Sequence, residues 1–598
     1  MDRERIEKKE MVFTGIPASP GIAFGEAFVI NVEDLPIEDE PVASAEVGRE
    51  IRRFEKALGQ TERELTDLSR TLEEEMGKEH AKILDSHILM LADETMRRET
   101  IETIKNEEIS APSAFHRVMD KTLRTFEQIE DQYLKERSED IRDVRRRVIR
   151  NLLGQKVEGL ANLRKKAIVV ARNLTPSDTA GFKRKYVLAF VSDIGGSTSH
   201  AAIMARSHGI PAVVGVDGFS SHTKPYDRII VDGISGQVVL NPTPETEEMY
   251  RTALEKFREM ERELLTLKDY PAQTLDGRKI ELSGNIENED EIDDVISHGA
   301  RGIGLFRTEY FFIARGTLPG EEEQYRFYAG VVRRISPDPV IIRTLDIGGD
   351  KIARWVSDSP EANPFMGWRG IRFTLARKDI FRTQLRAIYR AAAHGPVRIM
   401  FPMVSVVEEV RQARAICGEV IEDLRRERYQ VGTDVEIGIM VETPSAVAVA
   451  DHLAKEVDFF SIGSNDLVQY TLAVDRGNTR IAYLYDELHP SIIRMITDTV
   501  KAAHTNGIWA GLCGEMTASA GVHGTLLLLG TGLDELSAPP FMIPEIKKII
   551  RSVTFDESKM LLAKALEVST SKEIREIIDA HLREKRPELL EFVPKGRR

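Results

Sequence analysis

The sequence predicts a multidomain α/β protein, in which an α/β module with inserted helices is followed by a (β/α)8 barrel. Three observations carry this prediction. Short apolar strand candidates separated by turn signals lie at both ends of the first 240 residues. Between them, strong helix formers with little Gly or Pro fill residues 43–153. After residue 270, eight strand candidates alternate with helical stretches over roughly 300 residues, as a (β/α)8 barrel requires.

Length, composition and charge limit the classes of function that the protein can have. The 598 residues suggest about three to five domains, and no run of about 18 apolar residues predicts a membrane span. The charged stretch Met1–Glu10 does not resemble a secretory signal, so we expect a cytoplasmic protein. A net charge of −14 argues against a nucleic-acid partner. The two cysteines, Cys417 and Cys513, are far apart and offer neither a disulfide framework nor a CxxC metal pattern.

The first module is predicted to be discontinuous. Residues 11–30 mix β-branched and aromatic residues with Gly and Pro, which is typical of short strands and turns. Strand candidates resume after residue 166 as AIVVA, VLAFV, PAVVGV, RIIVDG and GQVVL. We therefore assign residues 1–42 and 154–242 to one α/β domain. Residues 43–153 form an inserted helical domain of three to five helices.

A connector is predicted after the first module. Asn241-Pro242-Thr243-Pro244 interrupts regular structure, and the next residues, to Lys268, have the pattern of a charged amphipathic helix. We interpret 243–269 as a linker helix with a hinge near Asn241-Pro242, although a surface helix of the next domain fits nearly as well. The barrel is assigned to 270–585 and a C-terminal tail to 586–598.

One histidine has the setting of a phosphoryl carrier. In GGSTSHAAIMAR, the stretch 195–206, a glycine pair follows an apolar run, and Ser197 or Thr198 can cap a helix whose first turn holds His200. The electropositive helix start disfavours an imidazolium, so the imidazole stays neutral and nucleophilic and can hold a phosphoryl group. From the spacing alone, an incidental histidine beside a capping turn is equally compatible.

Polar residues follow the barrel strand candidates, which are KIELSGNI, GIGLFRTE, VIIRTLDI, VRIMFPM, EIGIMVET, FFSIGSND, WAGLCGEM and ELSAP. The residues at these strand ends are Asn285, Arg307, Arg343, Glu442, Asn465, Asp466 and Cys513. Because the C-terminal strand ends form the active-site face of such barrels, these side chains are expected to converge. A doubly wound sheet is the alternative for this region.

The residue types at this mouth suit a small, highly anionic molecule. Arg307, Arg343 and Arg476 provide planar donor forks for phosphate or carboxylate. Glu442 and Asp466 are hard oxygen ligands that, with substrate oxygens and water, suit octahedral Mg²⁺. Any one of these residues could instead be a surface ion-pair partner. Cys513 could deliver a proton, or could simply be a packed thiol.

The combined motifs resemble the enzyme I family of the bacterial phosphoenolpyruvate-dependent sugar phosphotransferase system. The resemblance runs from about Thr14 to Pro540 and includes, in the family's order, ASPGIAFG, YLKERSEDIRDVRRR, LTPSDTAGF, TSHAAIMAR, GLFRTEYFF, RTLDIGGDK, NPFMGWRGIR, FPMVSVVEEVR, MVETPSAV, IGSNDLVQYTLAVDR and GLCGEM. It implies a swivelling phosphohistidine domain and a homodimer formed through the barrel. It also implies that the helical insert binds HPr, the histidine-containing phosphocarrier protein.

The resemblance also implies roles for individual residues. His200 would be the phosphorylated nucleophile, with Thr179 a possible hydrogen-bond partner, and Cys513 would protonate the enolate of pyruvate. Phosphoenolpyruvate would be bound by Arg307, Arg343, Asn465, Asp466 and Arg476. Mg²⁺ would be ligated by Glu442 and Asp466.

Two departures and three rival functions stay open. Ser197 stands where the family usually has a basic residue, and Lys78-Glu79 replaces an acidic pair, which leaves the contacts to HPr uncertain. The rivals are an enzyme like pyruvate phosphate dikinase or phosphoenolpyruvate synthase, a lyase of the phosphoenolpyruvate/pyruvate barrel type, and a regulatory relay without catalysis. The short helical stretch between the two parts of the first module leaves no room for a large nucleotide-grasping domain, which argues against the first rival.

Overall fold

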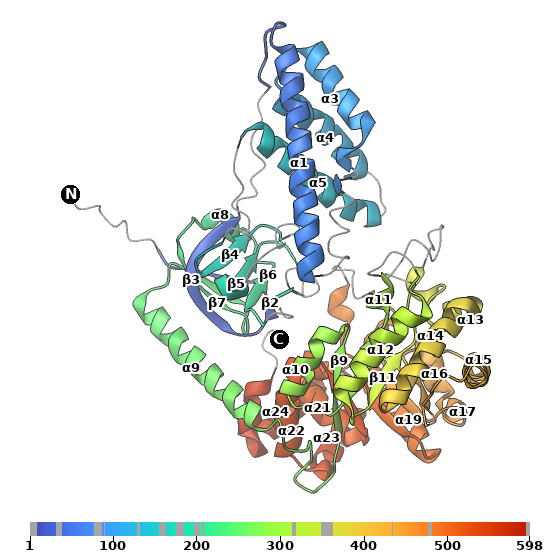
Figure 1. Ribbon diagram of the computed structural model, residues 1–598. Helices are drawn as coiled ribbons and strands as arrows, with labels where there is room; N and C mark the ends of the chain where they lie inside the picture. Colours follow the sequence, from blue (N-terminus) through green and yellow to red (C-terminus); the bar gives the residue numbers. More distant parts are fainter. Residues whose placement is uncertain are drawn as a thin grey trace. The chain divides into compact units, whose positions relative to one another are not determined.

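The computed structural model describes residues 9–30, 39–76, 87–88, 90–127, 132–154, 163–174, 184–195, 202, 204–205, 209–313, 318–348, 361, 363–432, 434–475 and 481–593. The chain forms two compact units, residues 1–258 and 259–598 (Figure 1). The predicted fold class, an α/β module with a helical insert followed by a (β/α)8 barrel, is confirmed.

The first unit is built on an eight-stranded sheet of order β1-β8-β7-β3-β4-β5-β6-β2. Its strands are β1 (Met11–Thr14), β2 (Ile16–Ser19), β3 (Ile22–Ile30), β4 (Ala167–Ala171), β5 (Val187–Ser192), β6 (Ala212–Val214), β7 (Arg228–Asp232) and β8 (Gln237–Leu240), with η2 (Arg184–Tyr186) and α8 (Phe219–His222) between them. Strand β3 lies parallel to β4, although more than a hundred residues separate them. The strands before and after the insert therefore form one sheet.

The insert is a bundle of long helices, α1 (Val47–Met76), α3 (Glu94–Glu107), α4 (Ala111–Glu127) and α5 (Gln132–Leu152) (Figure 1). Its core is separate from the two apolar clusters of the sheet and includes Phe54, Phe115 and Val148, all fully buried. The rings of Phe54 and Phe115 lie 5.6 Å apart between centroids, joining α1 to α4. The apolar periodicity that predicted helices thus produces a core of its own.

Helix α9 (Pro244–Thr266) connects the units, and its two halves pack differently. In the first half, Tyr250 is buried against Ile230 and Val239 of the sheet and donates a hydrogen bond to Gln237 Oε1 at 2.8 Å. In the second half, Leu264 joins the core of the barrel unit. The boundary between the units falls inside the helix, between Arg258 and Glu259.

This packing places the expected hinge, near Asn241-Pro242, within the first unit, because residues on both sides of it contact the same sheet. The backbone N–H of Asn241 donates to the carbonyl of Arg228 at 2.8 Å, so this segment is fixed to the sheet. The proline-rich sequence ends strand β8 and starts α9, but the apolar face of the next three turns holds the helix on the first unit. Proline marks a break in regular structure; side-chain packing decides whether that break is mobile.

The second unit contains a closed parallel barrel of order β9-β10-β11-β12-β13-β14-β15-β16. The strands are β9 (Glu281–Ile286), β10 (Ile303–Arg307), β11 (Val340–Arg343), β12 (Val397–Phe401), β13 (Glu436–Val441), β14 (Phe459–Ile462), β15 (Trp509–Leu512) and β16 (Glu535–Ala538). Each coincides with one of the eight strand candidates. Pairing of β16 with β9 closes the barrel, so the doubly wound alternative is wrong.

Helices surround this barrel in Figure 1. The α-helices are α10 (Ile292–Ser297), α11 (Glu309–Ile313), α12 (Glu321–Ile335), α13 (Ile371–Ala376), α14 (Lys378–Ala391), α15 (Val407–Arg426), α16 (Pro444–Ala448), α17 (Ala450–Leu453), α18 (Ser464–Leu472), α19 (Pro490–Thr505), α20 (Met516–Ser519), α21 (Gly521–Thr531), α22 (Ile543–Ser552), α23 (Phe555–Glu567) and α24 (Ser571–Lys585). Short 3-10 turns are η3 (Glu289–Glu291), η4 (Pro364–Met366), η5 (Ala392–His394), η6 (Ala482–Leu484), η7 (Pro540–Met542) and η8 (Pro587–Phe592).

The C-terminal end of the described chain corrects the expected tail at 586–598. Residues 587–592 form η8, in which Leu589 and Phe592 are buried in the barrel's core cluster. Two apolar side chains spaced three residues apart pack this turn on the core. The polar residues around them are typical of a C-terminal tail.

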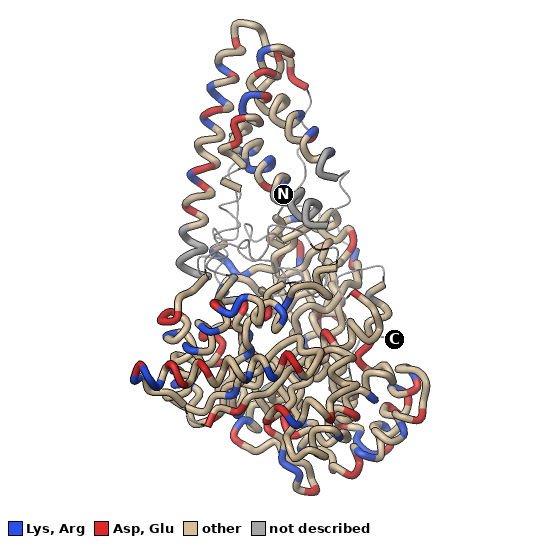
Figure 2. The backbone as a smooth tube through the Cα atoms, turned by 90° about the vertical axis from the view of Figure 1, so that its right-hand side faces the viewer, with Lys and Arg blue, Asp and Glu red and all other residues tan. Residues whose placement is uncertain are grey.

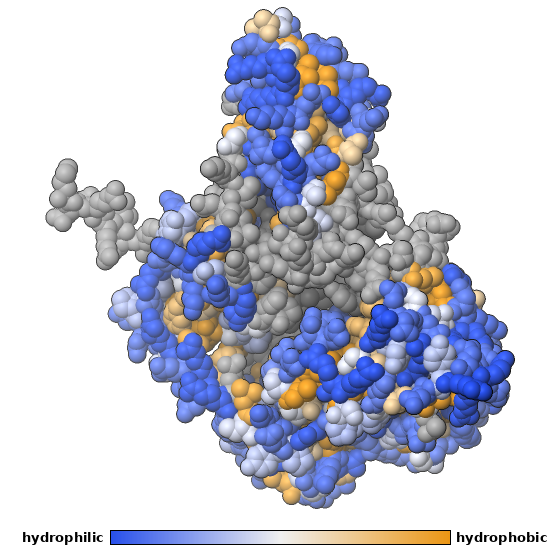
Figure 3. Space-filling model, viewed as in Figure 1, coloured by the Kyte–Doolittle hydropathy of each residue, from blue (hydrophilic) through white to orange (hydrophobic). Residues whose placement is uncertain are grey.

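Charges of both signs are interspersed along the chain (Figure 2), and hydrophilic residues dominate the described surface seen in Figure 3. None of the helices in the described part of the chain combines the length and apolar character that a membrane span requires.

Candidate active site

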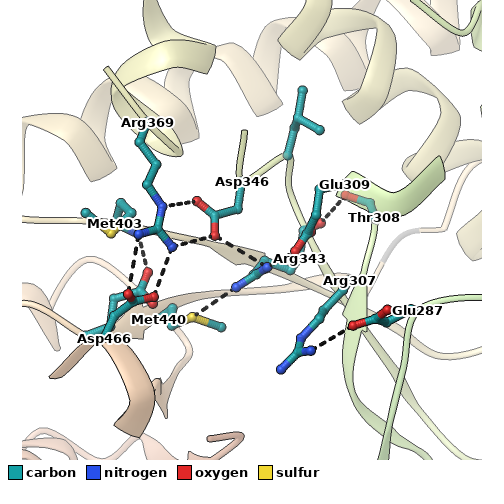
Figure 4. A network of polar contacts seen from close by, with 12 residues as sticks. Glu287, Arg307, Thr308, Glu309, Arg343, Asp346, Arg369, Met403, Met440 and Asp466 are labelled. Atoms are coloured by element: carbon teal, nitrogen blue, oxygen red, sulfur yellow. Dashed lines mark hydrogen bonds and ion pairs between the residues drawn. The ribbon is translucent and has the colours of Figure 1, made fainter. Parts of the chain in front are cut away.

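Two arginines end adjacent barrel strands. Arg307 is the last residue of β10 and Arg343 the last residue of β11, and the two are paired in register. Arg307 Nη1 donates to Glu287 Oε1 at 2.8 Å. Arg343 is buried, and its guanidinium pairs with Glu309 (Figure 4). The two donor forks therefore lie side by side at the C-terminal mouth of the barrel, as the strand-end pattern predicts.

A third arginine, Arg369, joins this pair to a carboxylate from another part of the chain. Its Nε and Nη2 atoms donate to the two carboxylate oxygens of Asp346, each at 3.0 Å. Its Nη1 and Nη2 atoms also donate to Asp466, at 3.3 and 3.0 Å. Asp346 in turn lies 3.4 Å from Arg343 Nη2. Figure 4 shows this continuous chain, Arg343–Asp346–Arg369–Asp466, in which every member is buried.

Glu442 and Asp466 come from neighbouring strand ends. Glu442 directly follows β13, and Asp466 lies in the first turn of α18, after β14. The carboxylate of Glu442 accepts a hydrogen bond from the Met403 N–H at 2.6 Å. It also lies over Gly463, where an added Cβ would be 2.9 Å from both Cβ and Oε2 of Glu442. Glycine at this position lets Glu442 approach the start of the helix that carries Asp466.

The electrostatics of this group favour one more cation. Four buried carboxyl groups, of Glu309, Asp346, Glu442 and Asp466, share two buried guanidinium groups, of Arg343 and Arg369. Burial, together with the negative charges of Asp466 and Asp346, raises the pKa of Glu442 to about 8. Burial opposes the charge of Arg369, but Asp346 and Asp466 outweigh it and raise its pKa. A surplus of hard oxygen donors beside buried arginines suits a divalent cation that also contacts an anion.

The carboxylates do not form a complete metal cage. Across the described residues, no three or more His, Cys, Asp or Glu side chains are grouped as metal ligands. Glu442 and Asp466 therefore fit a magnesium site of the type in which substrate oxygens and water supply the remaining ligands.

Cys513 and Asn465 complete the mouth. Cys513 follows β15, is 2% exposed, and directs its thiol at the carbonyl of Ile462, 3.8 Å from Sγ. Burial raises its pKa to about 12, so the thiol keeps its proton at neutral pH. Asn465 Oδ1 accepts a hydrogen bond from the Glu515 N–H at 2.8 Å. The amide of Asn285 donates to the Cys513 carbonyl at 3.3 Å.

Several predicted site residues lie outside the described residues: His200, Arg476, Thr179, Ser197 and Lys78. The residues near His200 in the sequence are partly described. Gly195 has φ +133°, a conformation that favours glycine, and Ala202, Met204 and Ala205 are helical and buried on the sheet.

Sequence reasoning missed Glu309, Asp346 and Arg369. Asp346 follows Arg343 by three residues in RTLDIGGD, and Arg369 lies in GWRG, so both belong to motifs that were recognised as segments. Neither ends a strand, and the strand-end rule therefore did not select them. A polar residue in a loop after a barrel strand, flanked by apolar residues, is the signal that would have found them.

Comparisons with known proteins place most of the chain in one group. Three family models match: "PEP-utilising enzyme, N-terminal" over residues 14–137, "PEP-utilising enzyme, mobile domain" over 163–236 and "PEP-utilising enzyme, PEP-binding domain" over 261–555. A phosphoenolpyruvate-protein phosphotransferase of Haemophilus influenzae is 41% identical over 573 residues, which are 96% of this chain and 99% of that protein. One of Staphylococcus carnosus is 41% identical over 568 residues, 95% of this chain and 98% of the relative.

Proposed function

The chain belongs to the phosphoenolpyruvate-protein phosphotransferases, and we propose that it moves the phosphoryl group of phosphoenolpyruvate first to its own His200 and then to a histidine of HPr, releasing pyruvate. The observation that carries this proposal is the buried chain of arginines and carboxylates at the barrel mouth. It offers donor forks for an anion with two acidic groups, beside oxygen ligands for a cation.

Substrate binding is assigned to the arginine side of the mouth. The phosphate and carboxylate of phosphoenolpyruvate each accept two parallel hydrogen bonds from a guanidinium group. Arg307 and Arg343 lie side by side at two strand ends, and we add Arg476, Asn465 and Asp466 to this set. The ion pair between Arg307 and Glu287 is partly exposed, so an incoming anion can compete for Arg307 at modest cost.

The metal assigned to this site is Mg²⁺, held by Glu442 and Asp466. When bound, Mg²⁺ neutralises charge on the transferred phosphoryl group. Arg369 fixes the position of Asp466 and is itself fixed by Asp346. A single buried network thereby fixes the substrate site and the metal site relative to each other.

The reaction depends mainly on how the substrate and the nucleophile are positioned. Phosphoryl transfer involves little covalent work by the protein, so aligned donors and a neutral imidazole at His200 supply most of what is needed. As the phosphorus–oxygen bond breaks, the enolate of pyruvate is left. Its C3 then takes the proton of the Cys513 thiol, which is kept protonated by burial.

We infer that transfer involves movement, because one histidine must serve the barrel mouth and then a second protein. His200 belongs to the first unit, and the arginines belong to the second. Because the first half of α9 packs on the sheet and its second half on the barrel core, we place the pivot in the middle of α9, around Arg258 and Glu259. We further assign HPr binding to the helical insert, 43–153, and homodimer formation to the barrel unit.

Purified protein incubated with radiolabelled phosphoenolpyruvate and Mg²⁺, with and without HPr or ATP, tests this function. The proposal expects stoichiometric labelling of the chain without HPr, continuous pyruvate release with HPr, and no dependence on ATP. ATP formation when AMP and phosphate (or pyrophosphate) are added would indicate a dikinase. Consumption of phosphoenolpyruvate without any labelled protein would indicate a lyase, and label without turnover would indicate a relay.

Replacing Arg369 with lysine should reduce pyruvate release about a hundredfold while the protein stays folded. A lysine ammonium cannot bind Asp346 and Asp466 bidentately at the same time, so Asp466 loses a buried partner worth roughly 3 kcal/mol. Steady-state turnover and thermal unfolding would be measured together. Arg377→Lys is the matched control, because the Arg377 guanidinium pairs with the exposed Asp379 in the first turn of α14. Equal turnover of both variants would remove Arg369 from the site.

A further inference from the structure

The interior of the barrel has two chemically different sides. On each strand the residues that alternate with the outer core point inward. Leu305, Ile341, Met400, Met440 and Phe459 form an apolar cluster there, which Cys513 also joins. Buried polar residues gather on the four adjacent strands β14, β15, β16 and β9: they are Ser461, Cys513, Glu535, Ser537 and Ser283. A polar strip therefore runs inside the barrel, below the mouth.

Glu535 is the unexplained member of this strip. It is the first residue of β16, at the end of the barrel opposite the mouth, and is 1% exposed. Neither carboxyl oxygen has a hydrogen bond of ordinary geometry within the described part of the chain, although the Ser283 hydroxyl of neighbouring β9 lies close enough to lower the pKa of this carboxyl group. The space it occupies is made by two glycines: a Cβ on Gly304 would overlap Oε1, and a Cβ on Gly511 would overlap Oε2. The fold thus makes room for a buried carboxyl group that no structural contact explains.

The strand register places Glu535 in line with Cys513. Ser461, Gly511 and Glu535 lie level with one another on β14, β15 and β16. The carboxyl group of Glu535 lies over Gly511, which stands between Glu535 and Ser461 in this row. Cys513 stands two residues beyond Gly511 on the same inner face of β15. The Ser461 hydroxyl is fully buried, makes no hydrogen bond of ordinary geometry to a described residue, and lies close enough to Cys513 to lower the pKa of its thiol.

The charges around Glu535 favour its protonated form. Glu281 of β9 lies beside it in register, and Arg398 of β12 already donates to Glu281 at 3.1 Å and to Glu436 at 2.8 Å. Burial, followed by the charge of Glu281, raises the pKa of Glu535 to about 8. Burial likewise raises the pKa of Cys513, with Ser461 opposing and with Glu535, Arg343 and Glu442 acting from a distance. At neutral pH both the carboxyl and the thiol therefore carry a proton.

We propose that Glu535 returns a proton to Cys513 through the hydroxyl of Ser461 after each turnover. This inference rests on the proposed role of Cys513. When enolate C3 takes the thiol proton, the S–H bond breaks and a buried thiolate remains. Ser461 gives its hydroxyl proton to the sulfur and takes the proton of the Glu535 carboxyl. The net change is one proton moved from Glu535 to Cys513, with no change of oxidation state.

The relay reaches solvent at the end of the barrel opposite the mouth. Glu281 is the register neighbour of Glu535, and its side chain is 34% exposed. The Glu535 carboxylate regains a proton from water on this side, away from the substrate. The arrangement allows the mouth to close over phosphoenolpyruvate without stopping the supply of protons.

Two assays separate the relay from the chemistry that it serves. Net turnover, measured as pyruvate released with HPr as acceptor, consumes one proton per cycle. Exchange of radiolabelled pyruvate into phosphoenolpyruvate does not, because Cys513 recovers its proton from the incoming pyruvate. Glu535→Gln keeps the shape of the neutral carboxyl group but cannot release a proton in this way. We expect it to lower net turnover at least tenfold while exchange stays within twofold of the native protein.

Substitutions of other residues in the polar strip make this test more specific. Ser461→Ala should resemble Glu535→Gln, and Glu535→Asp should recover part of the net turnover. Ser558→Ala is the matched control, because Ser558 is an equally buried hydroxyl in α23, outside the barrel interior, and its net turnover should change less than twofold. Cys513→Ala should lose both net turnover and exchange.

Three results would count against the relay. Unchanged net turnover of Glu535→Gln would overturn it, and so would a parallel loss of net turnover and exchange, which indicates a structural role. Equal losses in Ser461→Ala and Ser558→Ala would also overturn it. Full activity of Cys513→Ala in both assays would instead refute the proposed role of Cys513, so the two failures are distinguishable.

Discussion

Replacing Asp466 with asparagine should lower phosphorylation of the protein by phosphoenolpyruvate roughly a thousandfold. Asp466 is assigned two tasks, as a magnesium ligand and as a contact of the substrate, and it is one of two carboxylates that Arg369 binds. The amide keeps the size of the side chain but removes its charge. It leaves Arg369 with an unbalanced partner, a loss of roughly 3–5 kcal/mol for a buried pair, and Mg²⁺ with a single carboxylate.

Rapid quenching with radiolabelled phosphoenolpyruvate would measure the rate, and calorimetry would measure Mg²⁺ binding separately. Asp458→Asn is the matched control, because Asp458 accepts a backbone hydrogen bond from Ile437 at the other end of the barrel. Glu442→Gln should lose Mg²⁺ binding to a similar extent. If Asp466→Asn bound Mg²⁺ as tightly as the native protein, the metal site would be assigned to the wrong residues.

Replacing His200 with glutamine should reduce phosphorylation to the limit of detection, the largest effect we expect. Loss of a nucleophile that forms a covalent intermediate removes about six orders of magnitude of rate in comparable enzymes. The arginines and carboxylates of the barrel mouth belong to the other unit. The variant should therefore still bind phosphoenolpyruvate with Mg²⁺, which calorimetry can measure on the same sample.

The strands of both units were predictable because the sequence pattern and the tertiary environment agree. Most barrel strands are short apolar runs bounded by turn residues, and the strands are largely buried on both faces, including β9 and β16, which alternate apolar with polar residues. Strand β3 was harder, because its parallel neighbour β4 lies beyond the helical insert. The change in composition after residue 43, and its return after 166, was sufficient to predict that both flanks belong to one domain.

The site was predictable where a residue ends a strand. Arg307, Arg343, Glu442 and Cys513 were found by this rule, since the direction of a parallel strand fixes where its end lies. Arg369 and Asp346 were not, because they lie in loops whose path depends on contacts far along the chain. Glu535 was also missed. It stands at the opposite end of its strand, where polar residues are usually exposed, and only the glycines at 304 and 511 make space for it.

The position of a hinge depends on side-chain packing as well as on proline. Prolines are visible in a sequence as breaks, and the break at Pro242 was read as a pivot. The packing of Tyr250 depends on which face of α9 contacts the sheet. That contact cannot be predicted before the fold is known.

The identity of the phosphorylated residue is the most direct test of this account. The native protein would be incubated with phosphoenolpyruvate and Mg²⁺, digested at alkaline pH to preserve phosphohistidine, and mapped by tandem mass spectrometry beside His200→Gln. We expect one acid-labile phosphoryl group per chain, on His200, and none on the variant. A phosphoryl group on any other residue, or equal labelling of the variant, would contradict the account.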